Sequence, residues 1–120
     1  MKIVMKRFFP IIIVISLFAL ACTGSKTPAV EMTVHVWGNN EQCKATIEKA
    51  SRIEGVSEAT WSTDSKLLKL KLDTSVVNIN TILQAVAKAG YDNEKFYADD
   101  YAYNKLPESC QYERRPFETK

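Results

Sequence analysis

Cysteine is the residue type in this sequence best suited to hold a metal or carry redox chemistry, and Cys43 has the most informative position. Asn39 or Asn40 can cap a helix expected over residues 41–52, which places Cys43 in its first turn. Unpaired N–H groups and the helix dipole favour the charged thiolate there. A thiolate is a soft donor that selects Cu(I) or zinc. Cys43 is therefore a candidate ligand or reactive thiol, and a small buried core residue is the alternative.

Cys110 is the second sulfur of interest, because an exported protein meets an environment oxidising enough for two cysteines to pair. It lies in a C-terminal tail, residues 98–120, that is too aromatic for simple disorder but has no periodicity. We expect this tail to lie along the domain as irregular structure. The two cysteines either form a disulfide or serve separate roles, and both interpretations stay open at this point.

The first 21 residues have the layout of a secretory signal peptide. Three basic residues precede an apolar run over residues 11–21, which leads directly into Cys22. A spanning helix needs about 20 apolar residues, so this run is too short for one. Small and aliphatic residues before Cys22 predict that it is the lipidation site, followed by a tether over residues 22–30. We expect an exported protein held at the membrane of the cell envelope, with a plain secreted protein as the alternative.

Removal of this signal changes the charge of the protein. The 16 Lys and Arg fall to 13 against 14 Asp and Glu, so the formal charge falls from +2 to −1. Such a chain has no basic surface built for phosphate backbones, and nucleic acid is not an expected partner. The 99 residues that remain are enough for one domain with one modest core.

The sequence after the tether alternates between strand and helix patterns. Period-2 alternation predicts strands over residues 32–37, 56–61 and 68–72. Asn78 can cap a second helix that stops at Gly90, and a short last strand is expected over residues 91–96. The order β-α-β-β-α-β predicts an α+β, ferredoxin-like domain over residues 31–97. In this fold two helices pack on one face of a four-stranded antiparallel sheet.

Residues 32–96 resemble the heavy-metal-associated domain, a family that binds copper and related soft metals. The resemblance rests on a first strand that ends at Gly38, on the segment Gly38–Lys44 (GNNEQCK), and on Ala89–Asp92 (AGYD). Lipoprotein versions of this domain often read Gly-Asn-Cys-Gly-Met-Cys-Lys in the loop. On that alignment Cys43 is the second cysteine, and Asn40 replaces the first. Those versions also have a pair of cysteines in the tail, of which Cys110 remains here.

The resemblance implies a divergent lipoprotein member with an incomplete Cys-x-x-Cys motif. Its metal site would consist of Cys43 and Cys110, holding Cu(I) or another soft ion such as zinc. The ion would pass by exchange between thiolates to a metal-exchanging protein. The protein would act as a monomer or as a metal-bridged dimer in which two chains each donate Cys43.

Two other classes of function are alternatives to metal binding. An enzyme is not expected, because the sequence has no Ser-His-Asp or Cys-His pair in a recognisable context and no Gly-rich phosphate loop. The rival to metal binding is a disulfide-locked structural or protein-interaction module of the cell envelope, in which Cys43 and Cys110 are oxidised. The distance between their Cα atoms tests whether a disulfide can form, since a disulfide requires roughly 4.4–6.8 Å.

Overall fold

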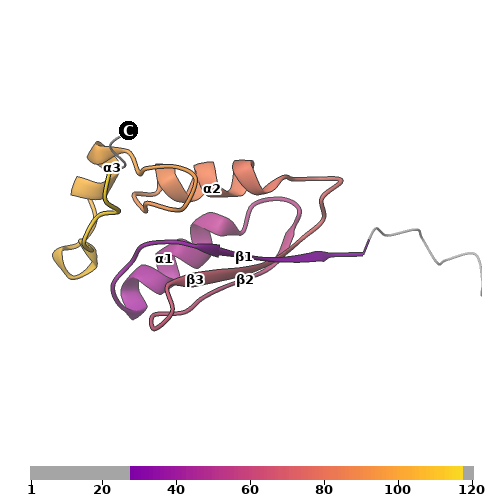
Figure 1. Cartoon of the computed structure of the whole chain (residues 1–120), viewed down its shortest axis with the longest axis horizontal. Helices are drawn as coiled ribbons and strands as arrows, with labels where there is room; N and C mark the ends of the chain where they lie inside the picture. Colours follow the sequence, from indigo (N-terminus) through magenta and orange to yellow (C-terminus); the bar gives the residue numbers. More distant parts are fainter. Residues whose placement is uncertain (1–27, 118–120) are drawn as a thin grey trace, which may run out of the picture.

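The computed structural model describes residues 28–117, so the predicted signal peptide and Cys22 lie outside the described residues. Figure 1 shows the elements along the chain. They are β1 (Val30–His35), α1 (Glu41–Ser51), β2 (Val56–Trp61), β3 (Leu67–Leu72), α2 (Ile79–Lys88), α3 (Asp100–Asn104) and the 3-10 helix η2 (Glu108–Cys110). Within residues 28–117, no helix combines the length and the apolar character that crossing a membrane requires.

The two long helices begin at the residues that the sequence predicts as caps. The side-chain oxygen of Asn40 accepts hydrogen bonds from the backbone amides of Gln42 and Cys43, and that of Asn78 accepts one from Thr81. These bonds satisfy amides that the first turn of a helix leaves without partners. After α2, Gly90 has a φ of +107°, a conformation in which a side chain is strained. Local sequence signals therefore set the start of both helices and the end of α2.

The described strands form a three-stranded antiparallel sheet in the order β1-β3-β2. Along β3, Leu68, Leu70 and Leu72 are buried in the core that α1 and α2 cover. In β2, Val56 pairs with Leu72 and Glu58 with Lys71, so Ser57 is an extra residue in a bulge. Residues three positions apart in a regular strand point to opposite faces. Because of the bulge, Val56 instead lies on the core side with Ala59 and Trp61.

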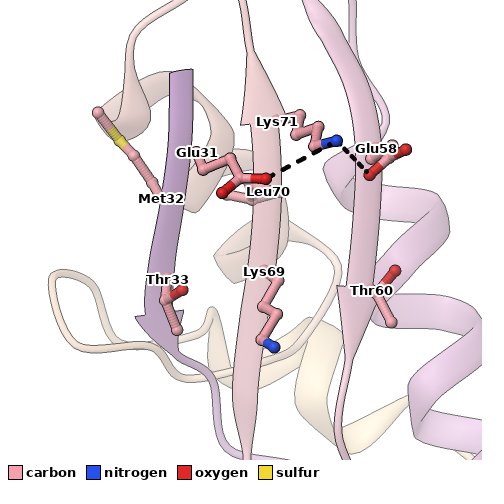
Figure 2. Close-up of a pocket in the computed structure, with 8 residues that line it drawn as sticks. All are labelled: Glu31, Met32, Thr33, Glu58, Thr60, Lys69, Leu70 and Lys71. Atoms are coloured by element: carbon pink, nitrogen blue, oxygen red, sulfur yellow. Dashed lines mark ion pairs between the residues drawn. The ribbon is translucent and has the colours of Figure 1, made fainter. Parts of the chain in front are cut away.

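The face of the sheet that points away from the helices is polar, as Figure 2 shows. Lys71 lies on the central strand and forms ion pairs with Glu31 at 3.7 Å and Glu58 at 3.5 Å. Thr33 and Thr60 complete a shallow hollow on this face. The alternation of leucine and lysine in β3 thus separates the core from solvent.

The expectation of a fourth strand over residues 91–96 is wrong within the described chain. A single bridge between Val36 and Asn93 takes its place. The Asn93 side-chain oxygen accepts hydrogen bonds from the amides of Lys95 and Phe96, which turns the backbone away from an extended ladder. The Asp92 carboxylate likewise binds backbone amides. Short polar side chains therefore compete successfully with strand pairing here.

The C-terminal tail belongs to the same hydrophobic core as the sheet and helices. Cys110 and Tyr112 are buried in one cluster with Cys43 and Ile47 of α1 and with Tyr91. The tail is also more regular than expected, since it contains α3 and η2. At one end of the molecule in Figure 1 it therefore closes over the start of α1, where η2 and α1 are in contact.

Candidate functional site

Cys43 and Cys110 form a disulfide bond that joins the first turn of α1 to η2. Their Cα atoms lie 5.5 Å apart although 67 positions separate them in the sequence. Both side chains are buried, with 0% and 1% of their residue surfaces exposed. The structure therefore brings the two predicted site residues together in their oxidised form, and it places them inside the core rather than at the surface.

Asn40 holds the tail in addition to capping the helix. Its side-chain oxygen accepts the Cys43 amide at 3.2 Å, while its side-chain nitrogen donates to the Ser109 carbonyl at 2.8 Å. Asn39 donates to the same carbonyl at 3.3 Å, and the Ser109 hydroxyl bonds to Gln42. The loop position that the family resemblance assigns to a first cysteine is thus occupied by a residue that binds backbone on both sides of the disulfide.

A buried tyrosine lies against the sulfur of the tail cysteine. The Tyr91 hydroxyl is 3.2 Å from Cys110 Sγ, close enough to donate a hydrogen bond to it. Burial raises the pKa of Tyr91, so this hydroxyl keeps its proton at neutral pH. Cys43 Sγ lies 3.6 Å from the Cys110 carbonyl oxygen. The Tyr91 hydroxyl and the Cys110 carbonyl are therefore polar neighbours of the sulfur pair.

Asp92 anchors the segment that follows Cys110. Its carboxylate is fully buried and accepts two hydrogen bonds from the Arg114 guanidinium, at 2.7 and 3.0 Å. The amides of Ala98 and Arg115 donate to it as well. Burial alone would raise the pKa of Asp92, but these hydrogen bonds and the Arg114 charge hold it below its ordinary value. The hydrogen bond to Asp92 in turn raises the pKa of Arg114.

This depressed pKa predicts a loss of stability in acid. The ionised carboxylate stabilises the folded state fully above the ordinary pKa of 3.8, and this contribution is lost as the pH falls through the lower folded-state value. Asp92→Asn is expected to lower the free energy of unfolding by about 2 kcal/mol at neutral pH. Because both proteins lack the charge in strong acid, the difference between them should shrink there.

Denaturant unfolding at neutral and acidic pH measures this difference. Asp64→Asn is the control, because Asp64 is an exposed turn residue that is not among the hydrogen-bond and ion-pair partners of Asp92. A difference between natural protein and Asp92→Asn that stays constant down to strong acid would contradict the role assigned to Asp92.

Other donors for a metal do not cluster with the two cysteines. Among residues 28–117, no group of three or more His, Cys, Asp or Glu side chains is placed to hold an ion. His35 stacks on Trp37, with 3.8 Å between ring centroids, and its pKa is lowered by burial despite the charge of Glu94. In the described chain, the protein donors available at the candidate site are therefore the two sulfurs.

Three solved structures are similar to this domain in fold. One is described as the CopZ metallochaperone, with a TM-score of 0.51 and 26% identity over 53% of this chain and 98% of that one. A second, from Bacillus anthracis str. Ames and assigned as copper-ion-binding, has a TM-score of 0.54 and 24% identity, covering 58% and 100%. A third is a copper-binding domain of HMA7, a P-type ATPase. Its TM-score is 0.51, with 23% identity over 53% of this chain and 89% of that one.

The fold is that of the heavy-metal-associated domain. No family model matches the chain, and no curated protein matches it by sequence. The similarity is therefore one of three-dimensional structure, at 23% to 26% sequence identity.

Several residues around the disulfide were not singled out as site residues from the sequence. Asp92 and Tyr91 lie in the AGYD motif, which could have marked them as neighbours of the loop. Arg114 carried no such signal, because 22 positions separate it from Asp92. Their roles depend on where the tail folds, which no local pattern encodes.

Proposed function

We propose that this protein is an envelope lipoprotein that binds a soft metal ion, Cu(I), through the thiolates of Cys43 and Cys110, and passes it to a metal-exchanging protein. The observation that carries the proposal is the meeting of these two cysteines at 5.5 Å between Cα atoms, from segments 67 positions apart. Cys43 also matches the ligand position of the family resemblance. The metallochaperone similarity at 26% identity supports the same class of function.

The donor set favours Cu(I) over zinc. Two sulfurs and no third ionisable ligand within the described residues suit a soft ion of low coordination number. Zinc in protein sites is almost always bound by four ligands, or by three with a water. A metal-bridged dimer would raise the number of sulfurs, and the mass of the metal-bound protein distinguishes it from a monomer.

Metal binding first requires reduction of the disulfide. Two electrons and two protons from an external dithiol convert the Cys43–Cys110 bond into two thiols, and the dithiol becomes a disulfide. Both thiols then release their protons as Cu(I) binds to the two sulfur atoms. The contacts of Asn40 and Gln42 with Ser109 are solvent-exposed, so a small displacement of the Ser109 segment is the proposed route to the sulfurs.

Anaerobic titration of the reduced, purified protein with Cu(I) against a competing chelator tests the proposal. We expect binding of one ion per chain, and a loss of affinity beyond about 100-fold in both Cys43→Ser and Cys110→Ser, since even indirect neighbours of a metal contribute 10–100-fold. Cys22→Ser keeps both sulfurs and is the matched control for Cu(I) binding. If Cys22 bears the lipid, the same variant should be lost from the membrane fraction of cells.

A second variant distinguishes a chain that has lost its metal site from a fold that cannot bind a metal ion. Asn40→Cys combined with Cys110→Ser places two sulfurs on the first turn of α1, at the Cys-x-x-Cys spacing of the family. Cu(I) binding by this protein, together with none in the natural chain, would mean that the fold retains the capacity and that the tail pair is not a metal site.

One observation favours a different class of function, a disulfide-locked structural or protein-interaction module. The disulfide is formed, and both sulfurs lie within the hydrophobic core. On this alternative the reduced protein should fail to compete for Cu(I), and the protein isolated from the cell envelope should contain the Cys43–Cys110 bond.

A further inference from the structure

The segment immediately after Cys110 is fixed to the domain by contacts that do not involve sulfur. The Tyr112 hydroxyl accepts the Asp92 amide and donates to the Gly90 carbonyl, both at 2.7 Å. The Tyr103 hydroxyl donates to the Tyr112 carbonyl at 2.7 Å. Arg114 completes the set through its two bonds to Asp92. We call Asp92, Tyr112 and Arg114 the tail latch.

Burial makes the tail latch strong. Asp92 is 0% exposed and Tyr112 is 3% exposed. The Arg114 guanidinium also lies 4.6 Å from the Tyr103 ring centre, which favours a cation over the ring face. Separating a buried charged group from its hydrogen-bond partner is unfavourable and costs free energy. None of these contacts includes a sulfur atom, so reduction of the disulfide removes none of them directly.

We infer that Asp92 and Arg114 are positioning residues for Cys110: the tail latch keeps its sulfur next to Cys43 after the disulfide is reduced. Cys110 is two residues before Tyr112, and two extended residues span at most about 7 Å. Without the latch, Cys110 would lie on a flexible segment, and linkers of this kind give effective concentrations in the millimolar range. The inference rests on the proposed use of the two cysteines as a thiol pair, but its test requires no metal.

The equilibrium with glutathione measures this positioning. Protein dithiol and oxidised glutathione convert to protein disulfide and two reduced glutathione molecules, with two electrons passing from protein to glutathione. We expect the equilibrium constant to fall by about tenfold or more in Asp92→Asn and in Arg114→Gln, because the thiols meet less often. Asn78→Ala is the control, since it weakens the cap of α2 away from the tail and should leave the constant unchanged.

Trypsin cleavage of the reduced protein gives an independent readout. The bond after Arg114 is susceptible, whereas the bond after Arg115 precedes Pro116 and resists trypsin. A closed latch predicts slow cleavage after Arg114 in the reduced natural protein and faster cleavage in Asp92→Asn. Tyr112→Phe, which loses only the hydroxyl, serves where a charge variant does not fold.

Two results overturn the inference. One is a folded latch variant whose glutathione equilibrium constant lies within about twofold of the natural value. That change is much smaller than the change expected when the effective concentration of the two thiols falls. The other is cleavage of the reduced natural protein after Arg114 at the rate of an unfolded chain. A normal latch with no Cu(I) binding would instead reject the proposed metal function and leave the positioning role intact.

Discussion

Cys110→Ser is expected to lower the free energy of unfolding of the oxidised protein by about 4 kcal/mol, from the loop-closure entropy of the unfolded chain. The disulfide closes a loop with a sequence separation of 67, and a loop of that size removes much of the freedom of the unfolded chain. Domains of this size have only about 5–15 kcal/mol of stability, so the loss is a large share of the total. Denaturant unfolding of natural and variant proteins measures it.

The controls for this prediction follow from the pairing. Cys43→Ser should lower the stability by the same amount, and the double variant should be no less stable than either single one, because all three lack the same bond. Addition of a reductant should bring the natural protein to the stability of the variants. Cys22→Ser should have no effect on the described domain. A loss below about 1 kcal/mol in Cys110→Ser would show that the disulfide does not constrain the unfolded chain as the entropy model requires.

Trp61→Ala is expected to lower the free energy of unfolding by about 3–5 kcal/mol, the usual cost of removing a fully buried large aromatic side chain. Trp61 is 0% exposed, and its ring lies against the loop that precedes α1, where a Cβ on Gly38 would be 2.9 Å from it. Its indole nitrogen donates to the Val36 carbonyl at 3.0 Å. The substitution therefore leaves both a cavity and an unpaired buried acceptor.

Far-ultraviolet circular dichroism during denaturant unfolding follows this change without relying on the deleted tryptophan. Trp61→Phe should be intermediate, since it keeps ring volume but leaves the Val36 carbonyl without its donor, at about 1–3 kcal/mol. Trp37→Ala removes the other tryptophan, which is only partly buried at the edge of the core, and should be milder still. An equal loss for Trp37→Ala and Trp61→Ala would contradict the central position given to Trp61.

Much of the fold follows from local patterns in the sequence. Asn40, Asn78 and Gly90 mark helix ends through their own side-chain or backbone chemistry, and the leucine–lysine alternation marks β3. The predicted last strand is absent for an equally local reason, since the Asn93 side chain binds the amides of Lys95 and Phe96, which lie within the predicted strand. Hydropathy patterns do not register that competition, because they record the polarity of a side chain and not the backbone amides that it binds.

The candidate site was less predictable than the fold. Each cysteine could be singled out by its residue type and by family resemblance, but their pairing depends on where the tail docks. That docking depends on Arg114 and Asp92, whose attraction is a property of the folded chain and not of either segment. The second role of Asn40, as a contact of the tail, could likewise not be predicted, because it depends on the folded position of Ser109.

The disulfide also determines how this domain would respond to a mechanical load. A pull applied between the segment before β1 and the end of the tail would enter the chain at one end and reach Cys43, from which the covalent bond leads straight to Cys110. The 67 positions between them would carry no tension, which withholds about 230 Å of contour length from extension. In the oxidised protein, β1 and the residues after Cys110 are therefore the parts that force can peel away. Reduction would expose the whole domain to the load.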